Sequence, residues 1–190
     1  ALALHEDPDL VAAIFDRCAE IYLPVAERIL DMDSVGGLFI GDDMGFKTAT
    51  MISPAHLREY VFPYHQRLAA MAHERGKVYL LHACGNLEAV MDDLIDGVGI
   101  DAKHSFEDII MPIEDVVARY GERTAIIGGI DMDLLCRAPE ARVRERVREV
   151  LNACMPGGSY VLGTGNSVAN YVPVENFLAM VDEGHRWAAA

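Results

Sequence analysis

The sequence lacks several of the signatures that identify a protein quickly. It has no CxxC pair, and no GxGxxG segment follows its first strand-like run, so the usual dinucleotide-binding fingerprint is absent. No apolar run reaches the roughly 18 residues that a membrane helix needs. The first ten residues have neither a basic segment nor an apolar core, so we expect no signal peptide.

Positive charge is also scarce. The 16 Lys and Arg residues stand against 30 Asp and Glu residues, which gives a net charge of −14 over 190 residues. Such a chain repels phosphate backbones, so we expect no nucleic-acid partner. The one basic cluster, Arg142, Arg144, Arg146 and Arg148, has Glu140, Glu145 and Glu149 among it and predicts an ion-paired helix face.

Cysteine is too sparse for a disulfide framework. The four residues have no characteristic spacing, and a chain with this much apolar content does not need cross-links, so we expect a reducing, cytoplasmic location. Cys18 and Cys154 lie in helical patterns among apolar neighbours and are predicted to be small buried side chains.

Helical segments and short apolar strands alternate along the whole chain, which predicts a single α/β domain over residues 1–190 with about five parallel strands. An open doubly wound sheet and a partial (β/α)8 barrel both fit, and a complete barrel needs about 250 residues. The end strands of a partial barrel expose unpaired backbone, so we expect a missing N-terminal half, a second copy or folded-over helices to cover them. The predicted helices are 9–30, 54–75 (capped by Ser53 and kinked or split by Pro63), 86–97, 112–120, 139–154 and 173–186, and the predicted strands are 37–41, 77–81, 98–102, 124–127 and 159–162.

Polar side chains follow every predicted strand. In parallel α/β folds the carboxyl ends of the strands carry the site, so these side chains are expected to share one rim. Strand ends are also polar simply because loops are solvated, but His and Cys are unusual choices for that purpose. The residues are Asp42 and Asp43; His82 and Cys84; Asp101, Lys103, His104 and Ser105; Asp131; and Thr164, Asn166 and Ser167.

The segment His82-Ala83-Cys84 is the sharpest of these signals. Side chains two apart on a strand point the same way, so His82 and Cys84 can offer nitrogen and sulfur to one metal ion. Zinc suits this pair and would need a third protein ligand and an open position for catalysis. The candidates for that ligand are Asp42, Asp43, Asp101, His104 and Asp131.

Other residues leave two interpretations open. Asp42 and Asp43 are either acid–base or hydrogen-bonding groups of a site or caps of their loop, and Asp131 is either functional or an N-cap. The aromatic residues Tyr60, Phe62, Tyr64 and Tyr171 either line a pocket for a large planar ligand or pack in the core and loops. His5, His56, His73 and His185 lie outside the strand ends and are predicted to be ordinary surface residues.

A series of motifs gives the chain a family resemblance. From about Asp7 to Trp187 it resembles the uroporphyrinogen decarboxylase superfamily, which contains haem-pathway decarboxylases and corrinoid-dependent methyltransferases. The resemblance implies the C-terminal part of a (β/α)8 barrel about twice this length, with strands matching roughly the fourth to the eighth. The motifs are Ile52-Ser53-Pro54, Phe62-Pro63-Tyr64, Leu81-His82-Ala83-Cys84-Gly85-Asn86, Gly128-Gly129-Ile130-Asp131 and Val161-Leu162-Gly163-Thr164-Gly165-Asn166.

The two branches of that superfamily imply different chemistry. The decarboxylases use no metal, draw on an N-terminal half that this chain lacks, and carry a Gly-His-Gly turn that here reads Gly163-Thr164-Gly165. In the methyltransferases an HxC pair and a later cysteine bind zinc, which activates a thiol acceptor for attack on a methyl–cobalt bond. The later cysteine falls at Asn166 here, so Asp42 or Asp43 would have to substitute.

Taken with the resemblance, the residues favour corrinoid-linked methyl transfer with a metal-activated acceptor. Corrinoid would act as substrate or as the cofactor of a corrinoid protein, and the assembly would be a homodimer or would include an N-terminal half-barrel. The alternatives are tetrapyrrole decarboxylation and a non-catalytic pocket or assembly module. The assigned roles are metal binding by His82 and Cys84, catalysis by Asp42, Asp43 and Asp131, and substrate binding by His104, Asn166 and Tyr171.

Overall fold

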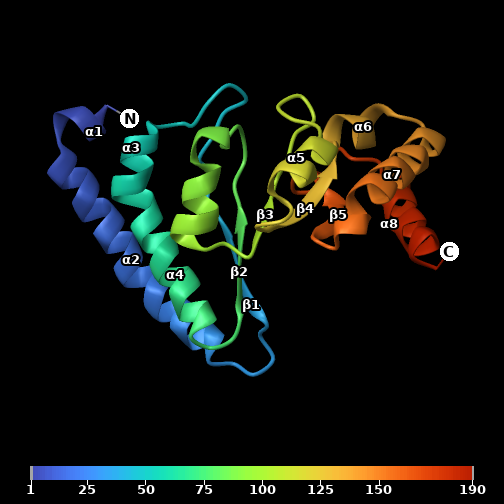
Figure 1. The fold of residues 1–190 in the computed structure, drawn as a ribbon. Helices are drawn as coiled ribbons and strands as arrows, with labels where there is room; N and C mark the ends of the chain where they lie inside the picture. The colour runs from blue at the N-terminus through green and yellow to red at the C-terminus, as the bar shows by residue number, and fades with distance from the viewer. Residues whose placement is uncertain (1, 190) are drawn as a thin grey trace. The chain divides into compact units, whose positions relative to one another are not determined.

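Five parallel strands with intervening helices make up the chain in a computed structural model that describes residues 2–189 (Figure 1). The chain divides into two compact units. The first comprises the residues up to His82 together with Asn86–Asp101, and the second comprises Ala83–Gly85 and the residues from Ala102 onward. That the chain acts as one domain stays a prediction.

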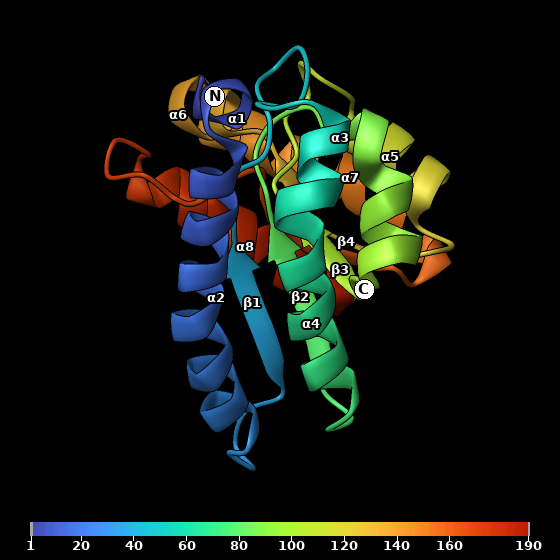
Figure 2. The same cartoon turned by 90° about the vertical axis from the view of Figure 1, so that its left-hand side faces the viewer.

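The first unit is a two-stranded parallel sheet covered by helices. Strands β1 and β2 pair in register from Gly37↔Val78 to Gly41↔His82. Helix α2 packs on β1 and α4 packs on β2, and Figure 2 shows the two helices side by side. The elements are α1 (Ala3–Glu6), α2 (Pro8–Leu30), β1 (Gly37–Gly41), α3 (Pro54–His56), the π-helix η1 (Leu57–Val61), α4 (Phe62–His73), β2 (Val78–His82), the 3-10 helix η2 (Glu88–Val90) and the π-helix η3 (Asp93–Val98).

The second unit has three parallel strands in the order β3-β4-β5. Helices α5 and α7 pack on β4, and α8 packs against α7. The core contains Ile126, Ile130, Val143 and Val147, all fully buried. The elements are β3 (Ala102–His104), α5 (Ile113–Tyr120), β4 (Ala125–Ile130), α6 (Met132–Arg137), α7 (Glu140–Cys154), the 3-10 helix η4 (Met155–Gly157), β5 (Tyr160–Thr164) and α8 (Val174–Ala188).

The helix predicted around Pro63 changes type just before that residue: α3, η1 and α4 follow one another without a break. The segment begins where Ser53 Oγ accepts a hydrogen bond from the His56 amide at 3.2 Å, which confirms the N-cap. The chain then widens into η1 before α4 starts, and Pro63 lies in the first turn of α4. Proline is tolerated there because that turn does not need its missing N–H.

The third strand was predicted in the wrong place. Val98 ends η3, Gly99 takes a left-handed conformation with φ of +79°, and β3 begins only at Ala102. The apolar run 98–100 therefore closes a helix instead of forming a strand. Asp101 precedes β3, where its carboxylate accepts from the Tyr79 amide at 2.7 Å, so its placement at a strand's carboxyl end was also wrong.

All four cysteines are free, and Cys154 is buried as expected. Cys18 is exposed, which contradicts the prediction of a buried side chain. It lies at the rim of a cavity beside β1, and within residues 2–189 β1 pairs with β2 alone. Over residues 2–189, no helix combines the length and apolar character needed to cross a membrane.

Candidate functional site

Two aspartates and a histidine lie together at the carboxyl end of the first unit's sheet. Asp42 and Asp43 follow β1, and the Asp42 amide donates to the His82 carbonyl at 2.9 Å. The His82 Nε2 atom lies 3.7 Å from an Asp43 carboxylate oxygen. Strand pairing therefore brings the predicted carboxylates to the predicted imidazole, although they are about 40 residues apart in the chain.

The Asp42 carboxylate has a buried partner that sequence reasoning missed. His65 on α4 contacts it through Nε2 at 3.0 Å, and His65 Nδ1 lies 2.6 Å from the Tyr79 hydroxyl. His65 is only 4% exposed and Tyr79 is fully buried. A detectable signal did exist, because His65 shares the apolar stripe of its helix with Leu68 and Ala72.

Cys84, which follows His82 by two residues, has its own surroundings in the second unit. Its sulfur accepts from the Asn166 side-chain amide at 3.3 Å and from the Ser105 hydroxyl at 3.6 Å. The Asn166 side-chain oxygen accepts from the Ser167 amide at 2.7 Å, which fixes the direction of the side chain. Cys84 and Asn166 are thus neighbours, and the Asn166 nitrogen faces the sulfur.

A buried lysine fixes the backbone around this thiol. Lys103 on β3 is 2% exposed, and its ammonium donates to the carbonyls of Ala83 at 3.1 Å and Ser105 at 2.7 Å. The same ammonium lies 4.1 Å from the centre of the Phe106 ring. Ser105 has φ of +82°, an unusual conformation for a residue with a side chain. Lys103 therefore holds the peptide that joins His82 to Cys84.

His104 lies against the other strands of its unit. Its Nε2 is 3.0 Å from the Thr164 carbonyl oxygen on β5. Gly128 has φ of +100°, and a Cβ there would lie 2.5 Å from that carbonyl and 3.0 Å from the His104 ring. The Gly128 position thus leaves room for the imidazole, and the substrate-binding role of His104 stays a prediction.

Asp131 and Tyr171, the remaining predicted site residues, lie just before helices α6 and α8. The Asp131 Oδ1 atom accepts from the amides of Asp133 at 2.7 Å and Leu134 at 3.4 Å, so this residue caps α6. Tyr171 is 71% exposed before the start of α8. Their catalytic and substrate-binding roles stay predictions.

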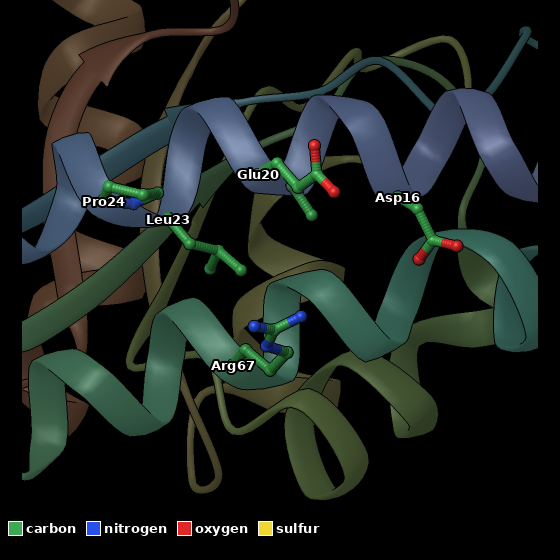
Figure 3. Close-up of a pocket in the computed structure, with 6 residues that line it drawn as sticks. Asp16, Glu20, Leu23, Pro24 and Arg67 are labelled. Atoms are coloured by element: carbon green, nitrogen blue, oxygen red, sulfur yellow. The ribbon is translucent and has the colours of Figure 1, made fainter.

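The helix layer of the first unit contains a separate cavity of about 310 Å³. Figure 3 shows Arg67 extending from α4 towards α2, where Glu20 and Leu23 face it. The neighbouring Asp16 carboxylate accepts from the Tyr64 hydroxyl at 2.9 Å. This cavity lies between two helices and away from the strand ends, so it is not part of the site. Its lining residues are Asp16, Ala19, Glu20, Leu23, Pro24 and Arg67.

Comparison with known proteins assigns the family. The family model described as uroporphyrinogen decarboxylase (URO-D) matches residues 2–187. The chain belongs to the uroporphyrinogen decarboxylase family. The URO-D resemblance drawn from the five sequence motifs is therefore confirmed across nearly the whole chain.

Relatives within this family have two different names. A uroporphyrinogen decarboxylase of Pseudoalteromonas atlantica is 24% identical over 96% of this chain and 50% of its own. One from Cupriavidus necator is 36% identical over 53% of this chain and 26% of its own. A methylated-thiol–coenzyme M methyltransferase of Methanosarcina mazei is 31% identical over 76% of this chain and 36% of its own. The chain spans about half the length of these curated relatives, or less.

Among solved structures, a methyltransferase from Methanosarcina mazei matches with a TM-score of 0.78 at 21% identity. The match covers 98% of this chain and 52% of the other. Together with the five parallel strands, it confirms the predicted α/β fold as part of a (β/α)8 barrel. Family membership leaves the reaction open between decarboxylation and methyl transfer.

Proposed function

We propose that this URO-D-family chain takes part in corrinoid-linked methyl transfer to a metal-activated acceptor. The observation that carries the proposal is its donor set: an imidazole at His82, a thiol at Cys84 and a carboxylate at Asp43, residue types that together can hold a metal ion. The 31% identity to a methyltransferase supports the same choice.

The donors suit zinc, which binds imidazole nitrogen, thiolate sulfur and carboxylate oxygen in catalytic sites with one position left open. Zinc bound there would supply a Lewis acid that lowers the pKa of an acceptor thiol. The chain's own residues position the ligands: Lys103 holds the Ala83 carbonyl between His82 and Cys84, and Asp43 lies beside His82. Asp43, which the structure places 3.7 Å from His82, is our choice of third ligand.

Asn166 distinguishes this chain from the methyltransferase pattern. The resemblance expects a third metal ligand at this position. Here the Asn166 side-chain nitrogen instead donates a hydrogen bond to the Cys84 sulfur. Asn166→Cys would place a second sulfur beside Cys84. We expect that variant to bind zinc more tightly than the natural sequence, because thiolates are strong zinc ligands.

Tetrapyrrole decarboxylation is the second candidate, favoured by the decarboxylases among the relatives. The turn at Gly163-Thr164-Gly165 lacks the histidine that the resemblance assigns to that branch. A non-catalytic pocket or assembly module is the third candidate. Binding of porphyrinogen without bound zinc would favour decarboxylation. Failure to bind either corrinoid or porphyrinogen would favour the non-catalytic module.

Metal content tests the proposal directly. We expect the purified chain to retain zinc, and we expect His82→Ala and Cys84→Ser to lose most of it. His185→Ala is the matched control because it removes an exposed imidazole on α8. Equal zinc in all four proteins, measured by elemental analysis after dialysis, would remove the metal hypothesis.

The assembly and location are also proposals. We propose that an N-terminal half-barrel or a second copy of the chain covers the free edge of β1, with a corrinoid protein as a further partner. The lengths of the relatives support the half-barrel, and the exposed Phe39 on β1 supports a covering element of either kind. A cytoplasmic location agrees with four free cysteines but rests on the reducing environment expected from the sequence.

A further inference from the structure

We propose that His65 and Tyr79 are positioning residues that fix the Asp42 carboxylate, so that Asp42 accepts a hydrogen bond from a donor group of the substrate. The proposal rests on the proposed function only in taking the bound molecule to be that reaction's substrate. The three side chains come from three different elements of the first unit: α4, β2 and the end of β1.

Hydrogen-bond accounting selects one arrangement. An ionised Asp42 carboxylate can only accept, so His65 Nε2 must carry the proton that joins them. In a neutral imidazole, His65 Nδ1 then accepts from the Tyr79 hydroxyl. Burial, and secondarily the charge of Asp42, raises the pKa of Tyr79, so its hydroxyl keeps the proton that it donates. A single neutral tautomer of His65 therefore satisfies all three groups.

The hydrogen-bonded series Tyr79–His65–Asp42, called the relay below, is buried at its Tyr79 end and partly exposed at its Asp42 end. Tyr79 is 0% exposed, whereas the Asp42 side chain is 46% exposed. The Asp42 backbone is held separately, because its amide donates to the His82 carbonyl at 2.9 Å. The carboxylate is thus fixed at both backbone and side chain, and its exposed part lies at the same strand end as His82.

A purely structural role does not account for the choice of histidine. A leucine at position 65 would extend the apolar stripe of Leu68 and Ala72 and would need no partner. A buried imidazole instead requires a hydrogen bond at each nitrogen, and it obtains one of them from a partly exposed carboxylate. This arrangement fixes the orientation of the Asp42 carboxylate, as an acceptor that faces a substrate requires.

Nitrogen NMR of the histidine rings tests the relay without requiring activity. In protein labelled with 15N-histidine, we expect His65 to show only the tautomer protonated at Nε2. In Tyr79→Phe, which keeps the ring and removes the hydroxyl, we expect a mixture of tautomers. Tyr64→Phe is the matched control, since it removes the adjacent hydroxyl that binds Asp16 and should leave His65 unchanged.

A kinetic measurement follows, with methylcobalamin as donor and a small thiol as acceptor. His65→Leu should lower kcat by about tenfold or more with little change in KM and in zinc content. If the natural chain proves inactive or metal-free, the proposed function fails. The NMR measurement of the His65 tautomer still tests the relay in that case. A wild-type His65 protonated at Nδ1, or a Tyr79→Phe spectrum identical to the wild type, would overturn the relay whatever the activity.

Discussion

Helix α2 of the first unit and helix α7 of the second have outer faces of opposite character. Along α2, large apolar side chains are more than a third exposed: Leu10, Ile14, Ile21, Tyr22, Val25 and Ile29. Along α7, arginines make ion pairs with its own acids and with those of α5 and α8. The face of α7 is suited to water, whereas the face of α2 is suited to burial against another protein segment.

The two end strands, by contrast, are alike. A cavity of about 430 Å³ lies beside β1 and one of about 400 Å³ lies beside β5. Each is mostly apolar, and each strand exposes about half of one large side chain there, Phe39 in β1 and Val161 in β5. Strands β1 and β5 therefore each have the surface expected where a further strand would pack. Of the two helices compared above, only α2 has an apolar outer face.

The largest effect is expected from removing Arg146, the least exposed ion-paired arginine of α7. Arg146 is only 13% exposed and pairs with Glu114 and, at 3.4 Å, with Asp108. Arg146→Met should cost about 3 kcal/mol of unfolding free energy, because it leaves two partly buried carboxylates without their cation. Urea unfolding measures this loss. Arg142→Met is the control, since its ion pairs are solvent-exposed, and an equal loss there would contradict the distinction.

Self-association should follow from the apolar face of α2. The double variant Tyr22→Lys/Val25→Lys is expected to weaken association of the chain by about tenfold or more, because it removes exposed apolar surface and adds like charges. Sedimentation equilibrium measures the change. The control Glu20→Lys reverses a charge on the same helix without removing apolar area. A monomeric wild-type chain would show that α2 alone does not drive assembly.

Local patterns predicted the fold well, and contacts between distant residues limited the prediction of the site. Hydrophobic periodicity gave α2, β1 and α7 nearly residue by residue, because this signal lies within each element. The strand at 98–102 was wrong because a short apolar run fits a helix end as well as a strand. The pairing of His65 with Asp42, 23 residues away, left only a histidine on an apolar stripe as its signal. The contact between Cys84 and Asn166, 82 residues apart, was indicated by the shared rim expected of the strand ends and, more specifically, by the family resemblance.

The cap of α6 gives a smaller, well-defined effect. Asp131→Ala should lower the unfolding free energy by about 1 kcal/mol, since two amides at the helix start lose their acceptor. Asp131→Asn keeps a side-chain oxygen and should retain most of the stability. If Asp131 also acts in catalysis, Asp131→Asn should lose activity while remaining stable. Thermal unfolding and activity measured on the same two variants separate the roles.

The smallest effect concerns pH and again depends on Arg146. The hydrogen bond from Arg146 lowers the pKa of Glu114 below its usual value of 4.5, with burial opposing the shift. An acid whose folded pKa is lowered adds stability above its unfolded pKa, and that stability disappears as the pH falls through the folded value. Asp108 works in the opposite direction, because burial raises its pKa and its ionised form costs stability.

Comparison of the wild type with Glu114→Gln isolates the first of these two acids. The stability gap between them should be full near neutral pH and should close as the pH falls below 4.5, through the lowered pKa of Glu114 in the folded state. Because the Glu114 side chain is 28% exposed, solvent screening keeps the gap small. Urea unfolding at several pH values measures it. A gap that widens on acidification would mean that burial, and not the hydrogen bond from Arg146, dominates the pKa of Glu114.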